Sequence, residues 1–281
     1  MTELQQKEFE LLQELVRVCD ELGLTYYLVC GSALGAAKYK GFIPWDDDMD
    51  VGLPRPDYEI FCQKAQELLP KGIFLQNNQT DPQYPLIYSK LRNSNTTFVE
   101  KSVSTRNMNH GIYIDVFPLD GYPNDPAQAS RVEAEKKRYK LSLLCCLNFK
   151  GSWKTKLLIA AERFMQLDKK PSRFVKRLER HISRYPIADS ALWCNHGNWQ
   201  GRLEYAPREQ YGAGQWAEFE GLKVRIPERY DEYLTQKYGD WRADLPDDQK
   251  EGHHYHLICD TTRSYKDYIK KAKKYSVQFR I

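Results

Sequence analysis

The chain lacks several features that mark specialised classes of protein. Its 281 residues contain no run of about 18 uncharged apolar residues, so we expect no helix that spans a membrane. Its seven cysteines are an odd number without Cys-x-x-Cys spacing, which favours reduced thiols over a disulfide framework. Residues 1–23 have the pattern of an amphipathic helix and not that of a signal peptide. These absences favour a cytoplasmic protein.

The charge balance excludes little but favours anionic partners. The net charge is +4 and the sequence pI is about 8.5, which is only mildly basic. This excess does not call for nucleic acid, and we expect none as a partner. It suits an anionic substrate or the inner face of a membrane. Nineteen tyrosines and six tryptophans add flat, half-polar surfaces that suit ring-bearing ligands.

Apolar periodicity predicts helices alternating with strands up to about residue 125, and mainly helices afterwards. Gly23 is expected to end the first helix, and Ser32 to be the N-cap of the second. The predicted helices cover residues 4–22, 32–40, 54–69, 128–147, 154–167, 172–183 and 229–237, and the predicted strands cover 26–30, 47–53, 72–76, 85–91, 96–99, 111–117 and parts of 214–226. We therefore expect a mixed α/β core over residues 1–125, with a helical region over 126–281 packed on it.

A short acidic segment, WDDDMD at residues 45–50, is the most informative part of the sequence. Asp48 and Asp50 stand two apart in a predicted strand, so their side chains are expected on one face. Two carboxylates so close together repel each other, and a divalent cation relieves that repulsion. Asp47 is expected on the opposite face and Asp46 in the preceding loop, which leaves both as alternative ligands.

Two other features point to the same chemistry. Gly31 and Ser32 follow an apolar run and open a predicted helix, where backbone N–H groups can hold a phosphate. Asp115 lies within the β-branched and aromatic run at 112–117, where an acid is costly to bury unless it is paired or binds a metal. It is expected to be a third metal ligand or the base that deprotonates an acceptor hydroxyl. Oxygen ligands beside a phosphate suit a hard cation, Mg²⁺ or Mn²⁺.

Three blocks of the sequence resemble the LicD family of phosphotransferases, which includes bacterial phosphocholine transferases and is related to fukutin and the fukutin-related protein. The blocks are GSALGAAKYKGFIPWDDDMDVGL at 31–53, HGIYIDVFPLDGYP at 110–123 and FEGLKVRIPERYDEYLTQKY at 219–238. The resemblance covers most of the chain, although residues 126–199 carry no block of the family.

The resemblance implies an α+β fold with a nucleotidyltransferase-like core, a mixed sheet and a mainly helical C-terminal part that helps to bind the acceptor. It also implies metal-dependent transfer of phosphocholine from CDP-choline to a sugar hydroxyl of a cell-surface glycan precursor. That precursor would be of the teichoic acid or lipopolysaccharide type and can be lipid-linked. Transfer of ribitol or glycerol phosphate from another CDP-alcohol, nucleotidyl transfer, or a binding module without activity are the alternatives. The residues themselves indicate a metal, a phosphate and a base.

Further polar residues are candidates for binding the substrate. Lys38 lies in the predicted helix after Ser32 and can either reach a phosphate or remain in solvent. Trp45 directly precedes the acids and can stack on a base or anchor the core. Lys90 and Arg92 stand two apart on one strand face, where they either clamp a phosphate or face solvent. The planar guanidinium makes Arg92 the better candidate.

The histidine-rich segment and two apolar segments are harder to interpret. His254 and His256 are candidates for substrate binding, because their spacing relative to the nearby cysteines matches no zinc site. The apolar segments at 141–149 and 157–165 flank the basic stretch KGSWKTK, a combination that can rest on a lipid surface. Packing between helices explains the same pattern, so peripheral membrane contact is an open expectation.

Overall fold

The computed structural model describes residues 1–148, 153–198, 201–246, 250, 252 and 256–268, and among these residues seven strands form one mixed sheet. The strands are β1 (Tyr27–Leu28), β2 (Asp50–Pro54), β3 (Ile73–Gln76), β4 (Ser89–Asn93), β6 (Ile112–Tyr122), β7 (Leu192–Cys194) and β8 (Tyr205–Pro207). The order is β1-β2-β6-β4-β3, and β7 and β8 extend the sheet from the end of β6. Strands β2 and β6 run parallel, and the other neighbouring pairs run antiparallel.

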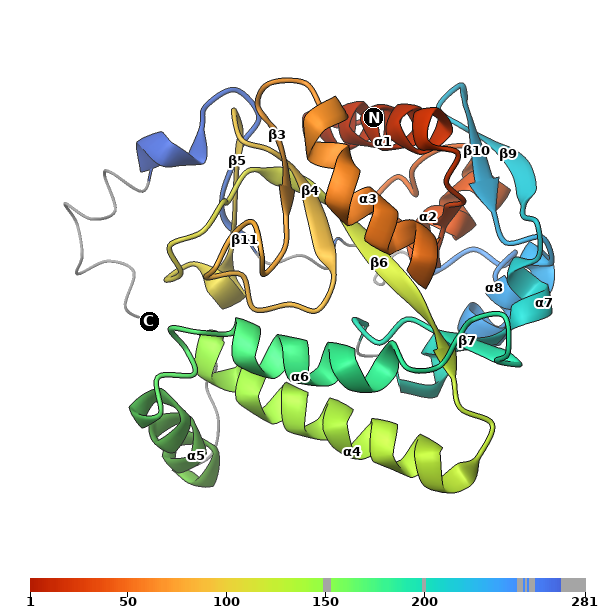
Figure 1. The fold of residues 1–281 in the computed structure, drawn as a ribbon. Helices are drawn as coiled ribbons and strands as arrows, with labels where there is room; N and C mark the ends of the chain where they lie inside the picture. Colours follow the sequence, from red (N-terminus) through yellow and green to blue (C-terminus); the bar gives the residue numbers. More distant parts are fainter. Residues whose placement is uncertain (149–152, 199–200, 247–249, 251, 253–255, 269–281) are drawn as a thin grey trace.

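Two further strand pairs and the helices surround this sheet (Figure 1). The pairs are β5 (Thr97–Glu100) with β11 (His256–Asp260), and β9 (Gln215–Phe219) with β10 (Leu222–Ile226). The α-helices of the described residues are α1 (Glu3–Leu22), α2 (Cys30–Leu34), α3 (Arg55–Leu68), α4 (Pro126–Leu143), α5 (Trp153–Phe164), α6 (Ser172–Ile182), α7 (Arg208–Tyr211) and α8 (Tyr230–Tyr238). A π-helical turn at Gly35–Tyr39 continues α2, and short 3-10 turns occupy Lys101–Val103, Leu144–Cys146 and Gly201–Glu204.

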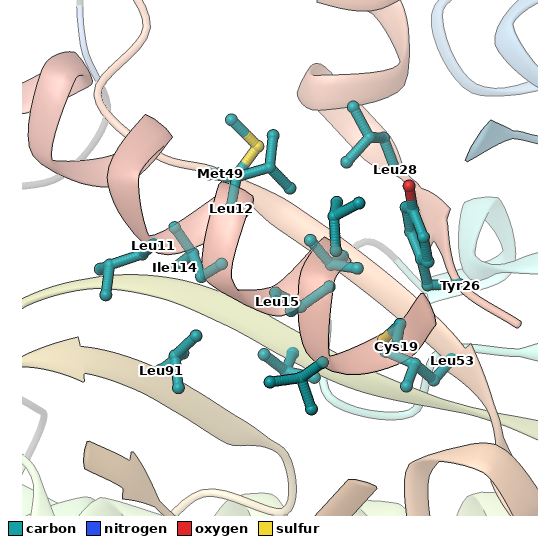
Figure 2. Packing of buried hydrophobic residues seen from close by; sticks show 14 of the residues in the cluster. Leu11, Leu12, Leu15, Cys19, Tyr26, Leu28, Met49, Leu53, Leu91 and Ile114 are labelled. Atoms are coloured by element: carbon teal, nitrogen blue, oxygen red, sulfur yellow. The ribbon is translucent and has the colours of Figure 1, made fainter. Parts of the chain in front are cut away.

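Helix α1 covers one face of the sheet and begins and ends as predicted. Thr2 caps it in a capping box with Gln5, and Gly23 ends it in the left-handed conformation, with φ at 67°. Figure 2 shows its apolar stripe against the strands, with Leu11, Leu12, Leu15 and Cys19 packed near Leu53, Leu91 and Ile114. Because Ile114 of β6 points toward α1, the next residue, Asp115, points to the opposite face.

An aromatic cluster covers that opposite face toward β7, α7 and α8. Tyr27 and Phe117 of the sheet pack there with Trp193, Tyr211 and Tyr233. The ring of Tyr211 stacks on that of Trp193, with 5.3 Å between centroids. Residues after 126 therefore contribute both strands and aromatic side chains to the face on which Asp115 lies.

Helices α4, α5 and α6 form a layer beside the sheet (Figure 1). Leu143 of α4, Ile159 of α5 and Leu178 of α6 share one buried cluster with Ile87, which precedes β4. Within the described part of the chain, none of the helices is long and apolar enough to cross a bilayer.

The predicted α+β fold is confirmed, but the predicted cap of the second helix is wrong. The helix begins at Cys30, and its N-cap position is Val29, whose side chain makes no capping hydrogen bond. Ser32 lies inside the helix, and its Oγ accepts a hydrogen bond from the N–H of Asp50 at 2.8 Å. The hydroxyl therefore joins α2 to the sheet and does not cap the helix.

The strand predicted over residues 47–53 begins later than expected. Asp46 closes a turn by donating its N–H to the carbonyl of Ile43 at 3.0 Å, and regular pairing starts at Asp50. Asp48 therefore precedes the strand. The alternation of side chains along a strand therefore applies to Asp50 but not to Asp48, and the prediction that both lie in one strand is wrong. The short strands β7, β8 and β11 were not predicted.

Candidate active site

Asp50 and Asp115 lie opposite each other at the start of the parallel β2–β6 pair. The N–H of Asp115 donates to the carbonyl of Met49 at 2.8 Å, which fixes the register of the two strands. The two residues are only 8% and 6% exposed. Paired residues of neighbouring strands point to the same face of a sheet. The structure thus brings two of the three predicted acids together on neighbouring strands.

The start of α2 lies beside these carboxylates and carries Gly31 and Ser32. A Cβ atom on Gly31 would come 2.9 Å from Oδ2 of Asp46, so a larger residue at this position would displace that carboxyl group. The first N–H groups of an α-helix have no partner within the helix. Phosphate binding by the backbone N–H groups of Gly31 and Ser32 stays a prediction. The close approach of the Asp46 carboxyl group is a separate reason for glycine at position 31.

Residues 46–48, the acidic turn, concentrate negative charge against α1. Burial, the charge of Asp48 and a hydrogen bond with Asp48 raise the pKa of Asp46 to about 8. Glu8 of α1 is only 2% exposed, and burial together with the charges of Asp48 and its neighbours raises its pKa well above the usual range. Gln5, one helical turn earlier, donates to the carbonyl of Asp46 at 2.9 Å. Such a cluster favours bound protons or a bound cation.

A buried ammonium group stands beside Asp115. Lys90 lies opposite Asp115 in the β4–β6 pair, with its Nζ 3.0 Å from Asp115 Oδ1 and 3.2 Å from Glu100 Oε1. The same Nζ lies 3.2 Å from the centroid of the Tyr113 ring. Burial alone would raise the pKa of Glu100, but Lys90 and Arg92 outweigh it and lower that pKa to about 2. Two cations and two carboxylates therefore form a buried network with balanced charge.

Arg92 belongs to this network and points into the protein. Its Nη1 donates to the carbonyl of Gly111 at 2.7 Å, its Nη2 donates to Glu100 at 3.0 Å, and its Nε donates to Gln76. The side chain is completely buried. This arrangement does not favour the phosphate contact predicted for Arg92. The guanidinium instead fixes Glu100, which in turn holds Lys90.

Lys38 lies near α2 but contacts the C-terminal part of the chain. Its Nζ donates to the carbonyls of Arg242 and Ala243 at 3.0 and 2.8 Å, and it lies 3.0 Å from Oδ1 of Asp244. The ammonium group therefore ties the π-helical turn to residues 242–244. In this arrangement Lys38 positions the C-terminal segment, and a phosphate would compete with Asp244 for it.

Residues near 250 border the acidic turn. The Nζ of Lys250 lies 5.5 Å from the centroid of the Trp45 ring. A Cβ atom on Gly252 would come 2.7 Å from Oδ2 of Asp47, so the main chain at this glycine passes directly over that carboxyl group. Trp45 is half-buried between these elements. The structure therefore places Trp45 at the edge of the acidic turn, next to a basic side chain.

Of the two predicted histidines, His256 is the first residue of β11 and lies opposite Glu100 of β5. It is exposed, and its ring centroid lies 4.9 Å from that of Phe98. Its strand thus adjoins the Lys90 network through Glu100. His254 lies outside the described residues.

The donor set of the site is suited to a cation that is shared with a substrate. No group of three His, Cys, Asp or Glu side chains within the described part of the chain is arranged to hold a metal ion. Mg²⁺ is commonly bound by one or two carboxylates, with waters and substrate phosphates as its other ligands. The acidic turn and Asp50 offer carboxylates for a site of that kind, whereas a closed cage would need more protein ligands.

Sequence reasoning missed Glu8 and Glu100. Glu8 interrupts the apolar stripe of α1 between Leu4 and Leu11. An acid on the buried face of a helix indicates a paired or functional carboxyl group, so this position could have been found from the sequence. Glu100 ends a short strand and gave no signal, because its cationic partners come from β4 and the pairing exists only in the folded chain.

Comparison with known proteins shows which proteins the chain is similar to. Residues 23–140 match the family described as LicD/FKTN/FKRP, nucleotidyltransferase domain. The chain is 26% identical over 249 residues to the lipopolysaccharide cholinephosphotransferase LicD of Haemophilus influenzae, an alignment that covers 84% of this chain and 89% of that protein. It is 28% identical over 116 residues to an uncharacterised protein of Rickettsia prowazekii, covering 41% of this chain and 40% of that protein. Residues 23–140 therefore carry a LicD-type nucleotidyltransferase domain, and the two similarities together support a phosphotransferase of the LicD type.

Proposed function

We propose that the protein transfers phosphocholine from CDP-choline to a sugar hydroxyl of a cell-surface glycan precursor of the lipopolysaccharide or teichoic acid type. Its similarity to the cholinephosphotransferase of Haemophilus influenzae, over most of both chains, supports the choice of phosphocholine and of a glycan. The observation that carries the proposal is the pairing of Asp50 with Asp115 on parallel strands, with the Lys90 ammonium 3.0 Å from Asp115. Such groups suit the positioning and hydroxyl activation that phosphoryl transfer needs.

Mg²⁺ or Mn²⁺ is the proposed cofactor, and the residues of the site fit a hard cation. Among the described residues, Oε2 of Glu8 is buried without a hydrogen-bond partner, and burial together with the charge of Asp48 raises the pKa of Asp46. Asp48 and Asp50 would hold the cation, with Asp115 as a third ligand if it is not the base. When bound, the cation neutralises the charge that develops on the donor phosphates.

The chain's own residues would position the donor and prepare the acceptor. The backbone N–H groups of Gly31 and Ser32 would hold a donor phosphate, and Trp45 would offer a surface for the cytosine ring. Asp115 would accept a proton from the sugar hydroxyl, and the Lys90 ammonium, 3.0 Å from its Oδ1, would hold the carboxylate in position. The hydroxyl oxygen would bond to the choline-bearing phosphorus as the bond to CMP breaks, and its proton would pass to Asp115.

We propose the cytoplasm as the place of this reaction. All seven cysteines are free thiols in the structure, as expected in a reducing compartment. A precursor that is still lipid-linked at the inner membrane face would be accessible to such an enzyme.

Calorimetric titration of the donor tests the proposed function. CDP-choline, CDP-ribitol and CTP would each be titrated with and without Mg²⁺ into the wild type, into Asp48→Asn/Asp50→Asn, and into Asp189→Asn as a control. Asp189 is exposed in a loop, so its loss of charge should leave binding unchanged. We expect Mg²⁺-dependent binding of CDP-choline in the wild type and the control, and its loss in the double variant.

The other outcomes separate the alternatives. Preference for CDP-ribitol would keep the proposed site and change the alcohol that is transferred. Tight binding of CTP without binding of a CDP-alcohol would favour nucleotidyl transfer, consistent with the family's nucleotidyltransferase domain. Mg²⁺-independent binding that survives in Asp48→Asn/Asp50→Asn would contradict the assignment of these two acids.

A further inference from the structure

Helix α5 carries the three most exposed large hydrophobic side chains of the described residues. Phe164 is 89% exposed, Trp153 is 71% exposed and Leu157 is 66% exposed. Met165, directly after the helix, is 55% exposed. Isolated exposed apolar residues are common on protein surfaces, but a large patch of them marks an interaction site. The proposed transferase chemistry makes no use of this helix.

These side chains form a continuous stripe along α5. Trp153, Leu157, Ala160 and Phe164 stand at positions i, i+4, i+7 and i+11, which lie on one face of a helix. All four are exposed. A helix on the surface of a globular protein normally directs its apolar face inward and its polar face outward. Helix α5 therefore presents an apolar face to its surroundings.

The opposite face anchors α5 to the protein. Ile159 is buried in the cluster of α4 and α6, and Glu162 is only 8% exposed. Oε1 of Glu162 accepts a hydrogen bond from the hydroxyl of Ser142 at 3.2 Å. The orientation of α5 is thus fixed by its own buried contacts, and Figure 1 shows the helix at the outer end of the α4–α6 layer.

The charge beside the stripe is positive. Glu162 is the single acidic residue of α5, and it is buried, whereas Lys156 and Arg163 are exposed along one edge of the stripe. The exposed Lys169 and Lys170 follow shortly after the helix. Trp, Leu and Phe beside lysine and arginine are the combination by which interfacial helices bind anionic membranes, the apolar residues entering the acyl boundary.

We propose that α5 docks the protein on a membrane that contains anionic lipids. The stripe of Trp153, Leu157 and Phe164 would enter the interfacial layer, and Lys156, with the basic residues after the helix, would face the lipid phosphates. A protein partner would more often meet a helix whose rim carries both charge signs, whereas here the exposed rim is basic. The proposal rests on the surface of α5 alone and does not depend on which donor the enzyme uses.

Co-sedimentation of the full chain with vesicles tests this docking. One set of vesicles would contain phosphatidylcholine alone, and the other phosphatidylcholine with phosphatidylglycerol. Leu157→Ser/Phe164→Ser removes two apolar residues of the stripe, and Ile60→Ser, at an exposed position on α3, is the matched control. Loss of one buried large apolar side chain weakens partitioning roughly tenfold. We therefore expect about a hundredfold weaker vesicle binding for the double variant and unchanged binding for the control.

A second variant tests the charge. Lys156→Gln/Lys169→Gln/Lys170→Gln should lower binding to the phosphatidylglycerol vesicles and abolish their advantage over phosphatidylcholine, and added salt should act in the same direction. Circular dichroism would show that each variant is folded. Equal vesicle binding by the wild type and the stripe variant would overturn the proposal. It would also be overturned if ultracentrifugation showed a wild-type dimer that the stripe substitutions dissociate, because the stripe would then bind a second copy.

Discussion

The Lys90 ammonium lies between two carboxylates, 3.0 Å from Oδ1 of Asp115 and 3.2 Å from Oε1 of Glu100. These acids come from two strands, β6 and β5, and the second of these strands pairs with β11 near the end of the described chain. One buried cation therefore links the proposed catalytic carboxylate to a C-terminal strand. Lys90 is therefore expected to contribute both to the stability of the fold and to the position of the proposed catalytic acid.

Replacement of this cation should cost both stability and activity. Lys90→Gln would leave the carboxylates of Asp115 and Glu100 with Arg92 as the remaining cation of the network, and loss of one partner of a buried pair costs about 3–5 kcal/mol. Urea unfolding would measure the loss, with Lys64→Gln on the exposed side of α3 as the control. The rate of transfer from the donor should also fall, because the Asp115 carboxylate loses the Lys90 ammonium that holds it in place. An unchanged free energy of unfolding would show that the network does not hold the strands together.

Glu100 should make the protein sensitive to acid. Its pKa of about 2 lies below the value of about 4.3 for an unfolded glutamate. A lowered pKa contributes stability that is complete above the unfolded value and is lost as the pH falls toward the folded value. Glu100→Gln should therefore lower the free energy of unfolding at neutral pH and flatten its dependence on pH between about 4 and 2. Urea unfolding at a series of pH values would measure this, with exposed Glu59→Gln as the control. Parallel pH profiles for the wild type and Glu100→Gln would refute the expected linkage.

Helix α1 and strand β6 were predictable because their signals are local. The stripe of α1, its capping residue Thr2 and the stop at Gly23 lie within one segment, and the predicted helix matches the observed one. The β-branched run around Asp115 likewise forms β6, although that strand continues further, to Tyr122.

The details around the acids depend on contacts between distant segments. The acidic turn is held by Gln5 of α1, and β2 starts where the hydroxyl of Ser32 accepts the N–H of Asp50. Neither contact leaves a periodic pattern in the sequence. The partners of Lys90 could not be predicted for the same reason. Basic residues at alternate positions of a strand, such as Lys90 and Arg92, are equally typical of an exposed strand face.

A methyl group at Gly31 should disturb the acidic turn. The Cβ of Gly31→Ala would meet Oδ2 of Asp46 at 2.9 Å, so this carboxyl group must move by a few tenths of an ångström or more. A shift of the acids relative to the donor reduces transfer steeply, since a misplacement of about 1 Å can cost roughly a hundredfold in rate. An assay of the transfer rate would compare Gly31→Ala with Gly31→Ala/Asp46→Ser, in which the shorter side chain removes the clash. We expect the transfer rate to be lowered in the first variant and partly restored in the second. Full activity of Gly31→Ala would mean that the turn accommodates the methyl group and that close approach at Gly31 is not needed.

Mg²⁺ should stabilise the protein more in mildly alkaline than in mildly acidic solution. The pKa of Asp46 is raised to about 8, chiefly by burial and then by Asp48, so its proton stabilises the folded chain until the pH rises through that value. In the presence of a chelator, the melting temperature should therefore fall as the pH rises from about 6 to about 8.5. A metal ion competes with protons for carboxylates and stabilises the state that binds it, so added Mg²⁺ should restore more of the melting temperature at the higher pH. Differential scanning fluorimetry of the wild type and Asp48→Asn/Asp50→Asn would measure both effects. A Mg²⁺ effect of equal size at the two pH values, or one that persists in the double variant, would place the cation elsewhere, because only binding at the acidic turn couples it to the proton of Asp46.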